Sequence, residues 1–328
     1  MGEKVHQNAP ISCPFTTELY FYTQVQKQYE IIQEKYAIPE DQRVRLPKLY
    51  GCRDEYLSET LVFEDLIAQG YKNFNRQKTA NLEYVKTAID LMARFHALSL
   101  AFHDNDPDAF DKASEKLRMD VSKMVAITAI MKPKMVSSAL EVVEDKYRDK
   151  LEKFLNQEQC PVLQFADMLR SKNKKILVHR DFKPSNLMHR RRNEKLEIIP
   201  VDFQGVIDGD PLNDLLYFIF TATDEEFRRL HHHNMLDLYH DCLTKALRRF
   251  NIDVETVYSK STYRDQLKEY SMVGLTMAVV VLPMVLAEEE KIPDFDTSEI
   301  TDFIVEASKT YKERLNGIVN NYVQWGLL

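Results

Sequence analysis

The chain has 328 residues, 44% hydrophobic and 29% charged, so it can bury a sizeable core in one large domain or two smaller ones. Its 51 acidic and 44 basic residues give a net charge of −7, which argues against a nucleic-acid partner. Four cysteines without CxxC spacing indicate free thiols, and the N-terminus lacks the apolar core of a signal peptide. We therefore expect a cytoplasmic protein without a nucleic-acid or membrane partner.

In chain order, the first predicted element is a helix over 14–36, followed by short β-like runs over 45–52 and 60–66. A polar turn joins the two runs, which predicts an antiparallel pair. The second run ends in Phe63-Glu64-Asp65-Leu66, and Gly70 then breaks the chain. From residue 81 an apolar stripe at helical spacing predicts a long helix, and further helices are expected over 108–131, 135–157 and 160–172.

The second half begins with a β-rich island, whose strands are predicted at 176–178, 187–188 and 196–201. Helices are expected over 212–221, 225–250, 263–287 and 298–325. The apolar run 272–287 is too short for a membrane span and predicts a buried helix kinked near Pro283. A small strand-containing part thus precedes a large helical part, and the fold class is α+β.

The most informative segments are VHRDFKPSN at 178–186 and VDFQ at 201–204. Asp181 lies five residues before Asn186, and Asp202 follows the last predicted strand of the island. Phosphotransferases use an Asp, an Asn and a second Asp in this order around ATP, a substrate hydroxyl and Mg²⁺. Asp181 is therefore the candidate catalytic base, Lys183 a candidate partner of the transferred phosphate, and Asn186 and Asp202 candidate Mg²⁺ ligands.

Basic and histidine residues near these segments have plainer interpretations. His179 is expected to orient the loop through backbone hydrogen bonds, whereas Arg180 fits either a phosphate contact or a local salt bridge. His96 is predicted to be a packed helix residue. The run Arg190–Arg192 predicts a solvated turn, and His231–His233 a solvated helix face, because consecutive helical residues diverge by roughly 100°.

Together with LVFEDL at 61–66, FHALS at 95–99 and DPLNDLLYF at 210–218, these segments resemble the ecdysteroid kinase-like family, the insect branch of the aminoglycoside and choline kinase-like phosphotransferases. The resemblance runs from about Phe15 to the C-terminus. It implies a protein-kinase-like two-lobed fold, with a partial N-terminal lobe and hinge over 1–70 and a helical C-terminal lobe over 71–328 that contains the catalytic β island, 176–204.

The resemblance also implies ATP- and Mg²⁺-dependent phosphorylation of a hydroxyl on a small molecule, either an ecdysteroid or a xenobiotic-like acceptor. By position, Asp181 matches the family's catalytic Asp, and Asn186 and Asp202 its metal ligands. The hinge, whose backbone meets the adenine, corresponds to Glu64, Asp65 and Leu66. The acceptor pocket is expected to be formed by residues 110–160 and 220–290. These segments and their borders contain aromatic residues and methionines, Tyr217 among them, which either line a pocket for an apolar acceptor or belong to the hydrophobic core.

Two further positions have implied roles. Glu18 matches the helix Glu that pairs with the ATP-binding Lys, although it fits equally well as one surface carboxylate among many. Asp214 is expected to support the catalytic loop rather than to bind substrate. The family usually has Gly where this chain has Arg180, which makes the loop less permissive.

The N-terminal end departs further from the family. Lys4 is the only lysine before Glu18, and no two of the 8 glycines form a GxGxxG phosphate loop. We therefore expect the chain to be N-terminally short, which leaves two hypotheses: a small-molecule kinase, or a catalytically impaired kinase-like binding protein. A protein kinase is disfavoured, because Asp210-Pro211 follows Asp202 too closely for an activation segment.

Overall fold

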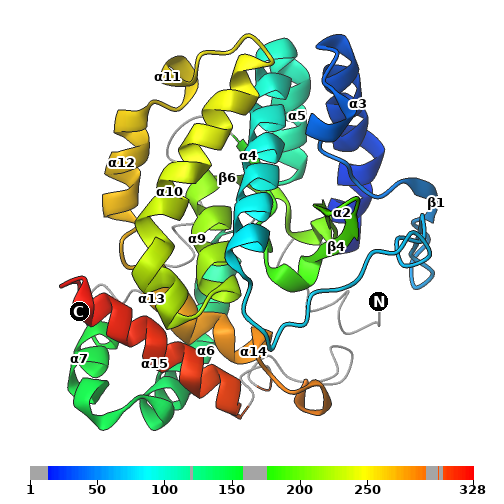
Figure 1. The fold of residues 1–328 in the computed structure, drawn as a ribbon. Coiled ribbons are helices and arrows are strands. Elements are labelled where there is room, and N and C mark those ends of the chain that lie inside the picture. The colour runs from blue at the N-terminus through cyan, green and yellow to red at the C-terminus, as the bar shows by residue number, and fades with distance from the viewer. Residues whose placement is uncertain (1–13, 119–120, 158–175, 293–301, 303–305) are drawn as a thin grey trace.

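The computed structural model describes residues 14–118, 121–157, 176–292, 302 and 306–328. Within these residues the protein is mostly helical, with three small two-stranded antiparallel sheets (Figure 1). This mixture of helices and strands agrees with the predicted α+β class. The division into two lobes near residue 70 stays a prediction.

The predicted first helix is present as α2 (Pro14–Tyr20), a π-helical turn (Phe21–Val25) and α3 (Gln26–Lys35). The wider π turn accommodates one additional residue, and the consecutive rings of Phe21 and Tyr22 are both buried. Phe21 stacks on Phe203 with ring centroids 4.0 Å apart, and Tyr22 meets the same ring edge-on. The first helix is thereby anchored to the segment that follows Asp202.

The predicted hairpin is confirmed, with β1 at Leu49–Arg53 and β2 at Thr60–Phe63 paired antiparallel. Both strands are shorter than the β-like runs that predict them. Phe63 packs against Tyr22, at 4.6 Å between ring centroids, whereas Tyr50 and Val62 are exposed. One face of the pair therefore covers the first helix, and the alternation of the strands turns the other face to solvent.

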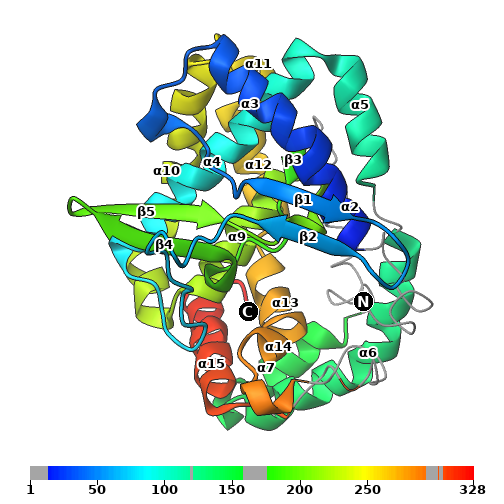
Figure 2. The same ribbon diagram turned by 90° about the vertical axis from the view of Figure 1, so that its right-hand side faces the viewer.

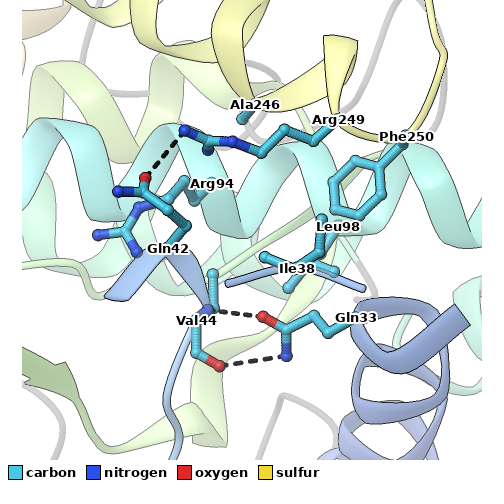
Figure 3. A pocket seen from close by; sticks show the side chains of 9 residues that line it. All are labelled: Gln33, Ile38, Gln42, Val44, Arg94, Leu98, Ala246, Arg249 and Phe250. Atoms are coloured by element: carbon cyan, nitrogen blue, oxygen red, sulfur yellow. Dashed lines mark hydrogen bonds between the residues drawn. The ribbon is translucent and has the colours of Figure 1, made fainter. Parts of the chain in front are cut away.

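The connection from α3 to β1 is held against α4 (Leu82–Asn105) and α10 (Glu225–Arg248), which pack along each other (Figure 1). Gln33 binds both backbone groups of Val44: its side-chain oxygen accepts from the N–H at 2.7 Å, and its amide donates to the carbonyl at 3.4 Å (Figure 3). Arg249, the residue that follows α10, donates to Gln42 at 2.9 Å in the same small pocket. These bonds fix the N-terminal segment on the helical part.

The β island contains two sheets. β4 (Leu187–Arg192) pairs with β5 (Lys195–Pro200), while β3 (Ile176–Val178) pairs with β6 (Ile207–Gly209), a strand that was not predicted. At Gly209 a Cβ atom would lie 2.6 Å from Val178 Cγ2, so this tight crossing requires glycine. The β3–β6 pair brings the loop after β3 next to the segment that contains Asp202.

Helix boundaries differ from the predictions in the middle of the chain. After α5 (Pro107–Lys116), helix α6 (Val121–Val142) continues through Pro133, where a break was predicted, and α7 is Asp145–Leu155. Met135 and Ala139 are buried after the proline, and their packing outweighs the lost backbone hydrogen bond. The helix predicted at 160–172 lies outside the described residues.

The C-terminal helices are α9 (Pro211–Ala222), α10, α11 (Val254–Val257), α12 (Lys260–Glu269), α13 (Val273–Val280), α14 (Leu282–Val285) and α15 (Lys309–Gln324). The single helix predicted at 263–287 is thus three helices, and the last break directly precedes Pro283, as expected for a proline in a first helical turn. Most of the segment predicted as helix before α15 lies outside the described residues. No helix in the described ranges is long and apolar enough to cross a membrane.

The interpretation of His231–His233 as a solvated helix face is wrong for the middle residue. His232 stacks on Trp325 of α15, with ring centroids 4.6 Å apart, and burial lowers its pKa to about 3. His233 is exposed. No group of three metal-binding side chains of the His, Cys, Asp or Glu types occurs in the described part of the chain.

Candidate active site

The loop after β3 is held by a buried carboxylate on α9. Asp214 accepts the backbone N–H of His179 at 2.7 Å and that of Arg180 at 2.6 Å. His96 of α4 contacts the same carboxylate at 3.0 Å and the hydroxyl of Tyr239 at 2.8 Å. The side chains of Asp214, His96 and Tyr239 are all buried. This agrees with a supporting role for Asp214 and with the prediction that His96 is a packed helix residue.

The backbone of the loop is strained at one position. Arg180 has a φ of 67°, in the left-handed region, which costs a non-glycine residue about 1–2 kcal/mol. The two N–H bonds to Asp214 hold the loop in this conformation, and the geometry gives a reason for glycine at this position in the family. Burial lowers the pKa of the Arg180 guanidinium, and the nearby charge of Asp181 counteracts that effect.

His179 connects the two functional loops through hydrogen bonds with backbone groups. Its Nδ1 accepts the N–H of Asp181 at 3.3 Å, so Nε2 carries the proton and donates to the carbonyl of Val201 at 3.0 Å. The ring is fully buried and lies 4.6 Å from that of Phe203. His179 therefore orients the loops, as predicted, and links the residues around Asp181 to those around Asp202.

The candidate base, Asp181, accepts hydrogen bonds at both carboxylate oxygens. The hydroxyl of Tyr217 donates to Oδ1 at 2.8 Å, and the amide of Asn186 donates to Oδ2 at 2.9 Å. The ammonium group of Lys183 forms an ion pair with Oδ2. The side chains of Asp181 and Lys183 retain 23% and 20% exposure, so a small molecule can reach them.

The amide of Asn186, one predicted metal ligand, lies between the carboxylate of the other, Asp202, and that of the candidate base, Asp181. Asn186 Nδ2 lies between Asp181 Oδ2 and Asp202 Oδ2, and is 3.2 Å from the latter. Asp202 has a φ of 68°, a left-handed conformation that begins the short turn 203–205. Burial raises the pKa of Asp202, and the charge of Asp181 adds to the effect. Two carboxylates thus share a site in which they repel each other.

This donor set fits Mg²⁺. The ion prefers carboxylate and amide oxygens, takes only one or two carboxylates from the protein and completes its shell with water and phosphate oxygens. A cation next to Asp202 would offset the repulsion from Asp181, and Oδ1 of Asn186 would be the neutral oxygen available to it. The sequence-predicted residues Asp181, Lys183, Asn186 and Asp202 are therefore all brought together, although they come from two separate loops.

Glu18 of α2 lies at the same site. Its carboxylate accepts the N–H of Phe203 at 3.1 Å, and burial together with the charge of Asp202 raises its pKa to about 7. The interpretation of Glu18 as one surface carboxylate among many is therefore wrong. Its pairing with an ATP-binding lysine stays a prediction.

The predicted hinge residues have different surroundings. Glu64 accepts from the backbone N–H of Lys48 at 2.9 Å and from the side chains of Arg45 at 3.0 Å and Gln69 at 2.7 Å. Burial acts to raise the pKa of Glu64, but these hydrogen bonds and the charge of Arg45 outweigh it and lower the pKa. The Glu64 side chain therefore stabilises the local structure. Its backbone N–H donates to the Lys48 carbonyl at 2.9 Å, so its backbone carbonyl is the group that could meet a ligand.

Asp65 and Leu66 complete the hinge. Asp65 accepts the N–H of Ala68 at 2.9 Å and so closes a turn. Leu66 is buried in a small apolar cluster with Tyr71, Met188 and Ile199. This cluster joins the hinge to the β4–β5 hairpin, the part of the molecule that directly follows Asn186 (Figure 2).

A cation–aromatic contact strengthens the same junction. The guanidinium groups of Arg45 and Arg190 lie 5.6 Å and 4.3 Å from the centre of the Tyr71 ring. Arg190 also binds Glu197 at 2.7 Å, and the hydroxyl of Tyr71 donates to Glu197 at 3.1 Å. The prediction that Arg190 lies in a solvated turn is therefore wrong, since the side chain ties the hairpin to the hinge. Arg191 is likewise paired, with a carboxylate of α4.

Sequence reasoning missed the polar contact of Tyr217, which was interpreted only as an aromatic of the core or of an acceptor pocket. One signal was available. Tyr217 follows Asp214 by three residues in a helix, so the two side chains lie on neighbouring positions of one face. A residue one turn after the loop-supporting Asp is thus a candidate for contact with the same loop.

The mostly helical fold with small sheets is compatible with a kinase-like family. A family model described as the ecdysteroid kinase-like family matches residues 3–252, which is more than half of the chain. The chain therefore belongs to the ecdysteroid kinase-like family. A comparison with curated proteins found no match. Membership suggests kinase-like phosphotransferase activity.

Proposed function

We propose that this protein transfers the γ-phosphoryl group of ATP to a hydroxyl of a small molecule, an ecdysteroid or a xenobiotic-like acceptor. The observation that carries the proposal is the convergence of Asp181, Asn186 and Asp202, with one amide nitrogen 2.9 Å and 3.2 Å from the two carboxylates. Membership of the family supports the class of reaction. The acceptor class follows from that membership alone.

In this proposal each residue has a separate role. Asp181 orients the acceptor hydroxyl and takes up its proton as the oxygen bonds to the γ-phosphorus, while the bond from that phosphorus to the leaving oxygen of ADP breaks. Lys183 stabilises the negative charge of the phosphoryl oxygens. Asn186 and Asp202 would hold Mg²⁺, which would supply positive charge to neutralise the phosphates. The products are ADP and a phosphate monoester.

The nucleotide site is proposed next to the hinge. Backbone groups of Glu64, Asp65 and Leu66 would meet the adenine edge. The apolar side chains of Leu66, Met188 and Ile199 form one cluster between the hinge and the strand that follows Asn186. A flat, weakly polar ring packs well against such side chains, so the cluster is suited to carry the adenine.

One observation favours the second candidate, a kinase-like protein that binds a nucleotide or small molecule without turnover. Glu18 accepts a backbone N–H, and its pKa is raised to about 7 by burial and by Asp202; among the residues that the structure describes, no lysine contributes to the shift. In an active site with the ATP-binding Lys, a cation would lower that pKa. Direct measurement of turnover separates the two candidates.

The test has a binding part and a turnover part. Calorimetry is expected to show Mg²⁺-dependent ATP binding that Asp202→Asn weakens at least tenfold, whereas the matched control Asp265→Asn, at an exposed position on α12, leaves it unchanged. Asp181→Asn is expected to reduce phosphorylation of an ecdysteroid at least 100-fold and to keep most of the ATP affinity, in the usual range for a lost general base. ATP binding without turnover by the wild-type chain on any hydroxyl acceptor would establish the second candidate, and absence of ATP binding would refute both nucleotide-based proposals.

A further inference from the structure

The carboxylate of Asp181 is held from two directions. Lys183 and Asn186, both in the catalytic loop, contact Oδ2. Tyr217, on the separate helix α9, donates its hydroxyl proton to Oδ1 at 2.8 Å. Asp214 lies one turn earlier on the same helix and accepts the two N–H groups that precede Asp181. Helix α9 therefore holds both the backbone of the loop and its central side chain.

The Tyr217 hydroxyl acts only as a donor to Asp181. Burial raises its pKa well above the usual value, and the charge of Asp181 raises it further. The hydroxyl consequently stays protonated over the whole physiological pH range, so it cannot serve as the base itself. A short hydrogen bond from a neutral donor to a carboxylate restricts rotation of that carboxylate about its χ2 angle.

The number of donors distinguishes the two oxygens of Asp181. A carboxylate oxygen has two lone pairs. At Oδ2 both are used, by Lys183 and by Asn186, whereas at Oδ1 Tyr217 uses one. Oδ1 thus retains the capacity to accept one more proton donor, and the bond from Tyr217 determines the direction in which that capacity points.

We propose that Tyr217 is a positioning residue for phosphoryl transfer, which fixes the rotamer of Asp181 and makes Oδ1 the oxygen that receives the acceptor's proton. This inference rests on the proposed function, because it assigns the role of Tyr217 through Asp181. Tyr217 does not need to touch the acceptor. Its contribution is the alignment of the base, an effect that belongs to the chemical step and not to ATP affinity.

The test uses the full chain and a matched pair of hydroxyl deletions. Tyr217→Phe removes the bond to Asp181 and keeps the ring. Tyr263→Phe removes a buried hydroxyl that donates to the Leu236 carbonyl at 2.6 Å, a bond in which no residue of the catalytic loop takes part, and it keeps the ring. Turnover is expressed per Mg²⁺-dependent ATP-binding site, so a loss of folded protein does not count as a loss of kcat.

We expect Tyr217→Phe to lower kcat about 10- to 100-fold with the KM for ATP changed less than about twofold, and Tyr263→Phe to change neither by more than about twofold. The double variant Asp181→Asn/Tyr217→Phe is expected to be no more than about threefold slower than Asp181→Asn alone, because both changes act through one carboxylate. Such non-additivity would not result from a general effect of Tyr217 on packing.

The outcomes separate the two levels of the argument. If the wild type turns over and Asp181→Asn lowers kcat at least 100-fold to a rate that is still measurable, but Tyr217→Phe keeps the wild-type kcat or multiplies the loss of Asp181→Asn in the double variant, then the inference about Tyr217 is wrong and the proposed function stands. If the wild type binds ATP and phosphorylates no hydroxyl acceptor, both the proposed function and the role of Tyr217 are refuted.

Discussion

Replacing Asp214 by asparagine keeps the size of a fully buried side chain and removes its charge. The carboxylate accepts from two backbone N–H groups, at 2.7 Å and 2.6 Å, and contacts His96 at 3.0 Å. An asparagine has only one acceptor oxygen. In either orientation of the amide, its NH₂ group would replace an oxygen that contacts a backbone N–H of the loop or His96. At least one buried polar group would therefore lose its partner.

The magnitude follows from these contacts. Each hydrogen bond to a charged group contributes about 1.5–3 kcal/mol, and an unsatisfied buried N–H costs about 1–3 kcal/mol. Relief from burying a charge offsets part of the loss. We therefore expect the free energy of unfolding to fall by about 3–5 kcal/mol. Because the same bonds hold Arg180 in a left-handed conformation, the loop is expected to relax and kcat to fall more than about tenfold.

The assay is urea unfolding followed by circular dichroism, together with phosphorylation of the acceptor at saturating ATP. Asp265→Asn serves as the control, since this exposed side chain pairs with Lys268 on its own helix and the change is expected to cost less than about 0.5 kcal/mol. If Asp214→Asn lowers the free energy of unfolding by less than about 1 kcal/mol, the hydrogen bonds of Asp214 do not hold the loop in place, and the reasoning above is wrong.

Three further predictions concern stability and reactivity. The pKa of Glu18 is raised from 4.5 to about 7, so between these pH values the folded state holds a proton that the unfolded state has released, and the free energy of unfolding falls as pH rises from about 4.5 to 7. Glu18→Gln is expected to remove this pH dependence and to raise the free energy of unfolding by at most about 3 kcal/mol at pH 8, measured by urea unfolding at a series of pH values. Gly274→Ala is expected to cost about 3 kcal/mol in the same assay, because the new Cβ would lie 2.1 Å from the Phe220 ring; an unchanged midpoint would mean that the ring moves freely. Alkylation followed by mass spectrometry is expected to label exposed Cys52 at least 100-fold faster than buried Cys242, whose pKa burial raises to about 12; equal rates would contradict that burial.

Local patterns in the sequence predicted the elements whose signals are themselves local. The long helix over α4 has its apolar stripe within its own residues, and the hairpin has its two β-like runs and turn close together in the chain. The sequence also predicted the site residues Asp181, Asn186 and Asp202, because they occur in this order at the borders of strands and each residue type has a specific use in phosphoryl transfer. These signals identified the class of protein.

Contacts between distant residues could not be inferred in this way. Strand β6 has only three residues and exists because Gly209 lets it pair closely with β3. Helix α6 continues through Pro133 because buried side chains beyond the proline anchor it. Arg190 has the sequence context of a charged turn, but its guanidinium lies over the ring of Tyr71, far away in the sequence, and binds Glu197 on the paired strand β5.

The sequence by itself thus determined the family, the helical character and the residue types of the site. Only the tertiary structure decided how those residues are held: Asp214 and Tyr217 of one helix face support the loop of Asp181, and Glu18 lies next to Asp202. The physical reason is that hydrogen bonds and burial depend on distances between segments, which packing of the whole chain sets and which no local spacing records.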